Sequence, residues 1–203
     1  MVQRCCGRAR SYEILKLYLA SASPRRAKLL KEAAIKFQIL KTGYHETHPR
    51  GMKPSRVVQK NALGKALSAL NKIKSGVILS ADTIVYSRGQ VIGKPKNLRD
   101  AEKILFSLQG RWQTVYTGVA LLSVRRGIKE KKILFHEKTR VKLKKMTLSE
   151  IQRYFKRVNP MDKAGAYAIQ TRTNSLAEET RGSFSNAVGL PMEKLKKTLN
   201  MLK

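Results

Sequence analysis

The stretch Gly76-Val-Ile-Leu-Ser-Ala81 is a short, unbroken run of apolar and small residues, which is typical of a buried strand. Asp82 follows it directly, and Thr83-Ile-Val-Tyr86 with Val91-Ile92 predicts a hairpin that turns at Arg88-Gly89. A carboxylate at the end of a buried strand needs a partner or a metal. Because Asp82 is also one of only three aspartates in the chain, it is the first candidate for chemistry.

Strands and helices alternate on both sides of this stretch. Ser23-Pro24 predicts a helix start, since serine is a preferred N-cap and proline fits the first helical position. Asn97 predicts another helix start, and Thr147-Leu-Ser-Glu150 is a capping box. We expect helices over residues 23–34, 54–74, 97–108 and 147–158 and after Gly189-Leu-Pro191, and strands over residues 17–21, 35–40, 76–81, 114–124, 131–143 and 165–170.

This alternation, with antiparallel hairpins mixed in, predicts an α/β fold with a mixed, bent β-sheet flanked by helices. The chain has 203 residues, a length that suits one domain built as two lobes around a cleft. We expect a basic N-terminal extension over residues 1–16, a single domain over residues 17–203, and a second lobe around residues 98–160.

The formal net charge is +30, and aromatic residues make up 6% of the chain. Such a charge attracts polyanions, so nucleic-acid binding stays open beside a merely solvated basic surface. The two cysteines, Cys5 and Cys6, are vicinal, and we expect a free pair in a reducing cytoplasm, with lipid modification or a redox role as alternatives. No apolar run is long enough to span a membrane, and Glu13 and Lys16 argue against a signal peptide.

Ser21-Ala-Ser23-Pro-Arg25-Arg26 places two hydroxyls and two guanidiniums at a predicted strand-to-helix junction, which suits an anion such as phosphate. An ordinary capped helix with surface arginines explains the same residues equally well. Two lysines are either site cations or surface lysines. Lys94 lies in the turn Gly93-Lys94-Pro95, and Lys65 is flanked by small residues on a predicted helix. His45, His48 and His136 show no metal-ligand spacing.

Taken together, these strings resemble the Maf family of nucleoside triphosphate pyrophosphatases, in the family's order and spacing from Leu19 to the C-terminus. The matching strings are Leu19-Ala-Ser-Ala-Ser-Pro-Arg-Arg26, Asn61-Ala-Leu-Gly-Lys65-Ala66, Ala81-Asp-Thr83, Gly93-Lys-Pro95, Thr117-Gly118, Asp162-Lys-Ala-Gly-Ala-Tyr167, Ile169-Gln170 and Val188-Gly-Leu-Pro191. The resemblance implies a fold related to inosine triphosphatases, and cleavage of a nucleoside triphosphate to its monophosphate and pyrophosphate with a divalent metal.

The resemblance also implies the role of each site residue. Asp82 would be the general base, and Glu46 with Asp82 would hold Mg²⁺ or Mn²⁺. Ser21, Ser23, Arg26, Lys65 and Lys94 would bind the phosphates. Arg25, Thr83 and Gln170 occupy three class-determining positions and are similar to the class that acts on dTTP and UTP, with modified pyrimidine nucleotides as further candidates. Asp162 is either a site carboxylate or a structural ion-pair partner.

Departures from the family pattern affect the expected selectivity for the nucleobase more than the expected hydrolysis. The family often has His where this chain has Gln113, and glycines where it has Thr171 and Thr173. Two alternatives from other classes remain: a basic nucleic-acid-binding protein on the same fold, and a cell-division regulator that acts through a protein partner. Family members often pair, so a homodimer stays open, and no membrane association is expected.

Overall fold

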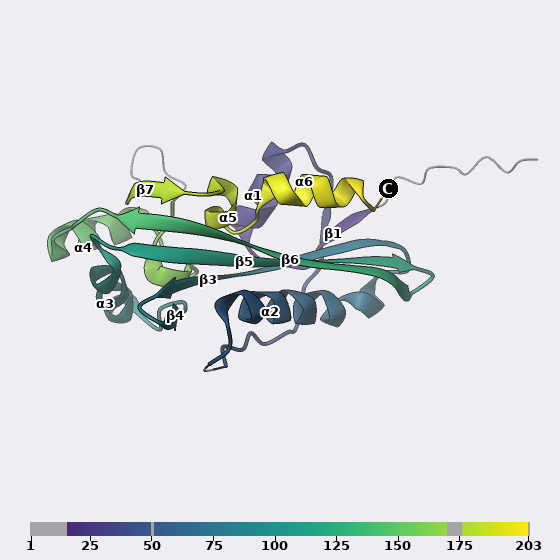
Figure 1. The fold of residues 1–203 in the computed structure, drawn as a ribbon, viewed down its shortest axis with the longest axis horizontal. Helices are drawn as coiled ribbons and strands as arrows, with labels where there is room; N and C mark the ends of the chain where they lie inside the picture. The colour runs from purple at the N-terminus through teal and green to yellow at the C-terminus, as the bar shows by residue number, and fades with distance from the viewer. Residues whose placement is uncertain (1–15, 50, 170–175, 203) are drawn as a thin grey trace, which may run out of the picture.

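The computed structural model describes residues 16–49, 51–169 and 176–202, within which seven strands form one mixed sheet (Figure 1). The order is β2-β1-β3-β5-β6-β7, and β4 pairs with β3. β1 runs parallel to β2 and β3, and the other pairs are antiparallel. The strands are β1 (Leu17–Leu19), β2 (Gln38–Ile39), β3 (Gly76–Ser87), β4 (Gln90–Ile92), β5 (Trp112–Arg125), β6 (Ile128–Leu143) and β7 (Ala177–Arg181). The predicted mixed α/β sheet is confirmed.

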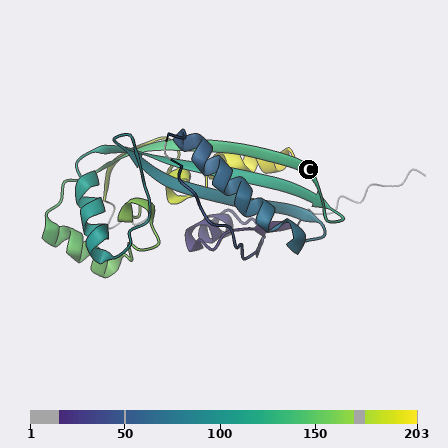
Figure 2. The ribbon, with the colours of Figure 1, turned by 90° about the horizontal axis from the view of Figure 1, so that it is seen from below.

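Helices cover both faces of the long central strands. α2 (Pro54–Ser68) lies along one face, and α1 (Pro24–Glu32), α5 (Phe184–Val188) and α6 (Met192–Asn200) lie on the other (Figure 1). Figure 2 shows α2 running across the strands from below. Gly118 permits this close packing, since a Cβ there would lie 2.5 Å from the carbonyl oxygen of Val58. A short 3₁₀ turn, Leu70–Lys72, follows α2.

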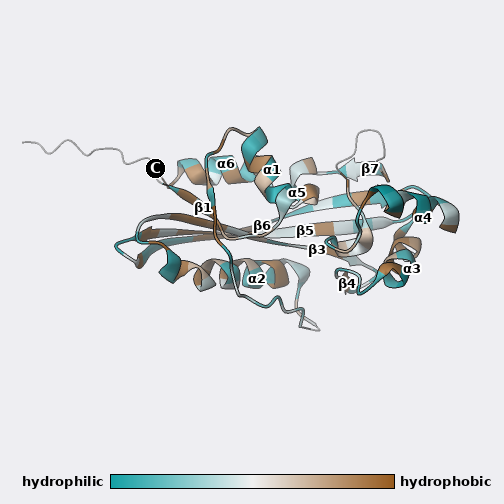
Figure 3. Ribbon diagram, turned by 180° about the vertical axis from the view of Figure 1, so that it is seen from behind, coloured by the Kyte–Doolittle hydropathy of each residue, from teal (hydrophilic) through white to brown (hydrophobic). Residues whose placement is uncertain are grey.

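A second group of helices packs at one end of the sheet, where Figure 3 shows it from behind. α3 (Leu98–Leu108), α4 (Leu148–Arg157) and the 3₁₀ turn η2 (Ala164–Ala166) share a buried apolar cluster with the ends of β3, β5 and β6. The Asn97 side chain accepts from the backbone N–H of Asp100, and Thr147 with Glu150 forms the predicted capping box. None of the described helices has both the length and the apolar character that crossing a membrane requires.

Several predicted boundaries are wrong. β3 continues unbroken through Asp82, which therefore sits in mid-strand opposite Gly118 rather than at a strand end. The predicted strand over residues 165–170 is instead a 3₁₀ turn followed by irregular chain over its described part, because Gly165 has a φ of 75° that a strand cannot accommodate. The helix expected over residues 54–74 ends at Ser68.

Some predictions lie outside the described residues. They concern the cysteine pair, Gln170, Thr171 and Thr173, and also the basic extension, of which only Lys16 is described. β7 and α5 are elements that the sequence did not predict.

Candidate functional site

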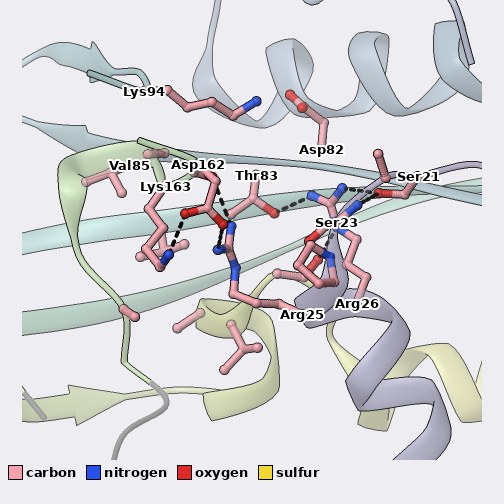
Figure 4. A pocket seen from close by; sticks show the side chains of 18 of the residues that line it. Ser21, Ser23, Arg25, Arg26, Asp82, Thr83, Val85, Lys94, Asp162 and Lys163 are labelled. Carbon is pink, nitrogen blue, oxygen red and sulfur yellow. Dashed lines mark hydrogen bonds and ion pairs between the residues drawn. The ribbon is translucent and has the colours of Figure 1, made fainter. Parts of the chain in front are cut away.

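A cavity of about 380 Å³ gathers side chains from eight separate segments of the chain, and Figure 4 shows part of its lining. Its lining includes five cations and three carboxylates, so the wall carries a net charge of +2. Such a surplus favours an anionic ligand. The predicted site residues that line it are Ser21, Ser23, Arg25, Arg26, Glu46, Lys65, Asp82, Thr83 and Lys94.

Arg26, in the first turn of α1, is held in one orientation by three hydrogen bonds. Its guanidinium donates to the Ser21 hydroxyl at 2.9 Å, to the Thr83 hydroxyl at 3.0 Å and to the Gly189 carbonyl at 2.8 Å. Burial lowers the pKa of Arg26, although the nearby carboxylates act in the opposite direction. The side chain is a preorganised cation at the wall of the cavity.

The start of α1 leaves backbone donors beside this cation. Ser23 is the N-cap residue and Pro24 occupies the first helical position, as the sequence predicted. The Ser23 side chain, however, makes no capping hydrogen bond, while its backbone N–H donates to the Ser21 hydroxyl at 3.3 Å. The first N–H groups of the helix are therefore not capped by that hydroxyl, and helix N-termini with such groups attract anions.

Lys65 joins the two carboxylates that the sequence assigned to a metal. Its ammonium lies 2.8 Å from Asp82 Oδ1 and 2.6 Å from Glu46 Oε1, and it donates to the Ala81 carbonyl at 3.2 Å. Lys65 is 7% exposed and Asp82 is 2% exposed. A buried charge needs such compensation, and the Lys65 ammonium supplies it to Asp82.

Asn61 completes this arrangement one helical turn before Lys65, and sequence reasoning assigned it no role. Its amide nitrogen donates to Asp82 Oδ2 at 2.9 Å and to the Thr47 carbonyl at 3.1 Å, and its oxygen accepts from the Thr47 N–H at 3.1 Å. The i, i+4 spacing from Lys65 places both side chains on one helix face, which is the signal that could have revealed it.

Glu46 reaches the cavity from the loop before α2. Burial by itself would raise its pKa, but the charge and hydrogen bond of Lys65, followed by the charges of Lys94 and Arg26, lower the pKa to about 2. Lys94 lies 3.7 Å from the second carboxylate oxygen. Glu46 is therefore an ionised carboxylate whose side chain is about one-third exposed to the cavity.

Arg25 turns toward the opposite end of the cavity. Figure 4 shows it reaching Asp162, whose carboxylate and backbone carbonyl accept at 2.6 and 3.1 Å. Although burial tends to raise the pKa of Asp162, the hydrogen bond from Lys163 and the Arg25 charge lower it. Asp162 is thus both a lining residue and an ion-pair partner, while Gln113 is buried without lining the cavity.

The donor set fits a magnesium-type ion that is shared with a ligand. Only Glu46 and Asp82 supply carboxylates at this end of the cavity, and within residues 16–49, 51–169 and 176–202 no three His, Cys, Asp or Glu side chains form a metal cluster. Mg²⁺ commonly takes one or two protein carboxylates and completes its shell with water and phosphate oxygens.

The fold resembles that of HAM1 proteins. The structure of a HAM1 protein from Coxiella burnetii superposes with a TM-score of 0.54 at 16% identity, covering 93% of this chain and 100% of that one. The Ham1 protein of Staphylococcus aureus gives 0.51 at 11% identity, with 93% and 100% covered. At these identities the likeness defines the fold class alone.

The sequence defines the family within that class. The family model described as Maf-like protein matches residues 16–202, so the chain belongs to the Maf family, as the resemblance implied. A dTTP/UTP pyrophosphatase of Gloeobacter violaceus is 41% identical over 178 residues, 88% of this chain and 91% of the relative. One of Thermosipho melanesiensis is 43% identical over 183 residues, covering 88% and 93%.

Proposed function

We propose that this chain is a nucleoside triphosphate pyrophosphatase that hydrolyses the α–β phosphoanhydride of dTTP and UTP. The observation that carries the proposal is the Lys65-bridged pair of Asp82 and Glu46 in a cavity with Arg26 and Lys94. The names of the relatives support the same reaction and the same two nucleotides. Modified pyrimidine nucleotides remain alternative substrates.

The cations would bind and orient the triphosphate. Ser21, Ser23 and Arg26 stand beside the N-terminus of α1, and Lys65 and Lys94 stand near Glu46. Charge builds up on the leaving pyrophosphate as the bond breaks, and cations that are already fixed in place stabilise that charge without reorganising. Arg26 fits this role because its three protein contacts hold it in position.

Asp82 would act as the general base. A carboxylate that is paired with Lys65 and oriented by Asn61 can take a proton from a water that attacks the α-phosphorus. Glu46 and Asp82 would hold Mg²⁺ or Mn²⁺, which when bound neutralises phosphate charge. Arg25, Thr83 and Gln170 would select the pyrimidine, with Asp162 orienting Arg25.

Pyrophosphate release tests the proposal. Purified protein is incubated with dTTP, UTP, CTP, GTP and 7-methyl-GTP in the presence of Mg²⁺ or Mn²⁺. We expect release from dTTP and UTP, and a loss of about 10²–10⁴-fold in Asp82→Asn, the range typical of a general base. Asp100→Asn is the matched control, because Asp100 lies at the start of α3 and does not line the cavity.

Three outcomes would contradict parts of the proposal. Silence on every nucleotide would reject the activity, and equal rates for Asp82→Asn and wild type would reject Asp82 as the base. A best rate with 7-methyl-GTP would reject the pyrimidine preference. The proposal also includes a homodimer, because family members often pair, and sedimentation tests it. It further includes a cytoplasmic location, which depends on the expected free cysteines.

A further inference from the structure

An open face of the sheet lies at the end where β7 joins β6, away from the residues that line the cavity. Paired residues on neighbouring strands point to the same face. Three such rows run across this end: Tyr86–Thr114–Arg140–Arg181, Ile84–Tyr116–Lys138 and Trp112–Lys142–Glu179. We call Tyr86, Trp112, Tyr116, Lys138, Arg140, Lys142 and Arg181 the aromatic face.

No described helix packs over most of these residues. The alternating residues Val85, Val115 and Val141 point the other way and pack with α3 and α4. Among these rows, the apolar contacts of α2 reach that of Ile84 and Tyr116, through Val57 and Val58. Figure 1 shows the ends of β5, β6 and β7 with no helix in front, whereas Figure 3 shows α4 in front of them from behind.

The aromatic rings on this face are half-buried and interleaved with cations. Tyr86 and Tyr116 meet edge to face with ring centroids 6.2 Å apart. The guanidinium carbons of Arg140 and Arg181 each lie 4.8 Å from the centre of the Trp112 ring. Rings and guanidinium planes are the surfaces on which unpaired bases stack.

The charge of the face is incompletely neutralised. Glu178 pairs with Lys142 at 3.0 Å and Glu179 pairs with Arg181 at 2.7 Å. Lys138 and Arg140, both exposed, pair with no carboxylate of the described residues. A hollow of about 440 Å³ beside them is lined by Tyr116 and Lys138, among others. A second copy of this chain would bring like charges together across a two-fold axis, so the charge favours an anionic partner.

We propose that the aromatic face binds single-stranded nucleic acid. Phosphates contact Lys138 and Arg140, and bases stack on the tyrosines and on the outer side of the arginine–tryptophan stack. A duplex is a poor fit, because its bases are already stacked and paired. None of the residues of the aromatic face lines the catalytic cavity, so this binding can be tested separately from the proposed hydrolysis. It also gives part of the +30 charge a function that one triphosphate does not require.

The only tryptophan of the chain reports on this face directly. Oligouridylate and oligodeoxythymidylate of about ten nucleotides, a length within the usual site size, are titrated against Trp112 fluorescence. We expect saturable quenching by either single strand and much weaker binding of a duplex of equal length. Inorganic polyphosphate, which lacks bases, should compete poorly. Preference for the duplex, or saturation without any change in fluorescence, overturns the proposal.

Charge reversal separates a local site from the general basic surface. Lys138→Glu/Arg140→Glu alters the aromatic face, while Lys129→Glu/Lys132→Glu makes the same charge change at exposed positions of the same strand, outside that face. Each lost phosphate contact lowers the slope of the logarithm of the binding constant against the logarithm of the salt concentration by about 0.7. The first variant should therefore bind about 25-fold more weakly than wild type at 0.1 M salt, with a slope lower by about 1.4. The control should change little.

Equal weakening by both variants overturns the proposal, because binding would then follow net charge alone. If Arg140→Glu disturbs folding, Lys138→Glu against Lys132→Glu should still differ about fivefold. Pyrophosphate release from dTTP is measured on the same preparations and should be unchanged in both variants. A protein that binds single strands but lacks that activity would reject the proposed enzyme and leave this proposal standing.

Discussion

Replacing Lys65 by methionine tests how the site is built into the core. The substitution keeps the length of the side chain but removes the ammonium that lies 2.8 Å from Asp82 and 2.6 Å from Glu46. Glu46 can turn toward water, because its side chain is 31% exposed, whereas the Asp82 side chain is only 3% exposed. Asp82 is then left with the single hydrogen bond from Asn61. A carboxylate stranded in this way is strongly destabilising.

The expected loss is about 3–5 kcal/mol of unfolding free energy, the usual cost of removing one partner from a buried ion pair. Natural domains have about 5–15 kcal/mol in total, so a large fraction of the stability is lost. For a chain of this size, the loss lowers the Tm by roughly 6–20 °C. Urea unfolding at pH 7 measures the free energy. Lys60→Met, at an exposed position of the same helix, should stay within about 0.5 kcal/mol of wild type.

The double variant Lys65→Met/Asp82→Asn decides whether the stranded charge is the cause. An amide needs no counter-ion, so the stability lost in the double variant should fall short of the sum of the two single losses by about 0.5–3 kcal/mol. If its loss equals the sum of the two single losses, the destabilisation comes from packing and the reasoning is wrong. A Lys65→Met protein as stable as Lys60→Met would refute it as well.

Three further predictions concern acid stability, packing and base choice. The pKa of Glu46 is lowered from 4.5 to about 2, so its stabilisation is complete above pH 4.5 and is lost as the pH falls toward 2; the unfolding free-energy difference between wild type and Glu46→Gln should shrink across that window in metal-free buffer. Gly118→Ala should cost about 1–3 kcal/mol in thermal unfolding because its Cβ would overlap α2, whereas Gly43→Ala, which has open space, should cost far less. Arg25→Trp and Gln170→Glu should change the ranking of nucleotides in the pyrophosphate assay while release continues, and an unchanged ranking would reject both assignments.

Short stretches of sequence predicted many of the helix starts and turns of the fold. The caps at Asn97 and Thr147, the helix start at Ser23 and the turn at Arg88-Gly89 were all identified from the sequence, and the structure confirms them. These features depend on residues close together in the chain, whose backbone preferences act before any tertiary contact forms. β7, with the polar sequence Ala-Glu-Glu-Thr-Arg, carries no such signal, because its pairing with β6 alone makes it a strand.

The residues of the site were recognised from short strings, but their relations were not. The sequence by itself determined which side chains to suspect, through a scarce aspartate and through the set of strings that resembles the Maf family. Only the tertiary structure brought Lys65 between Asp82 and Glu46, engaged Arg25 with Asp162, and placed three aromatic rings on one open face. Those contacts join segments far apart in the chain, and their geometry depends on strand register and helix packing, which no local propensity specifies.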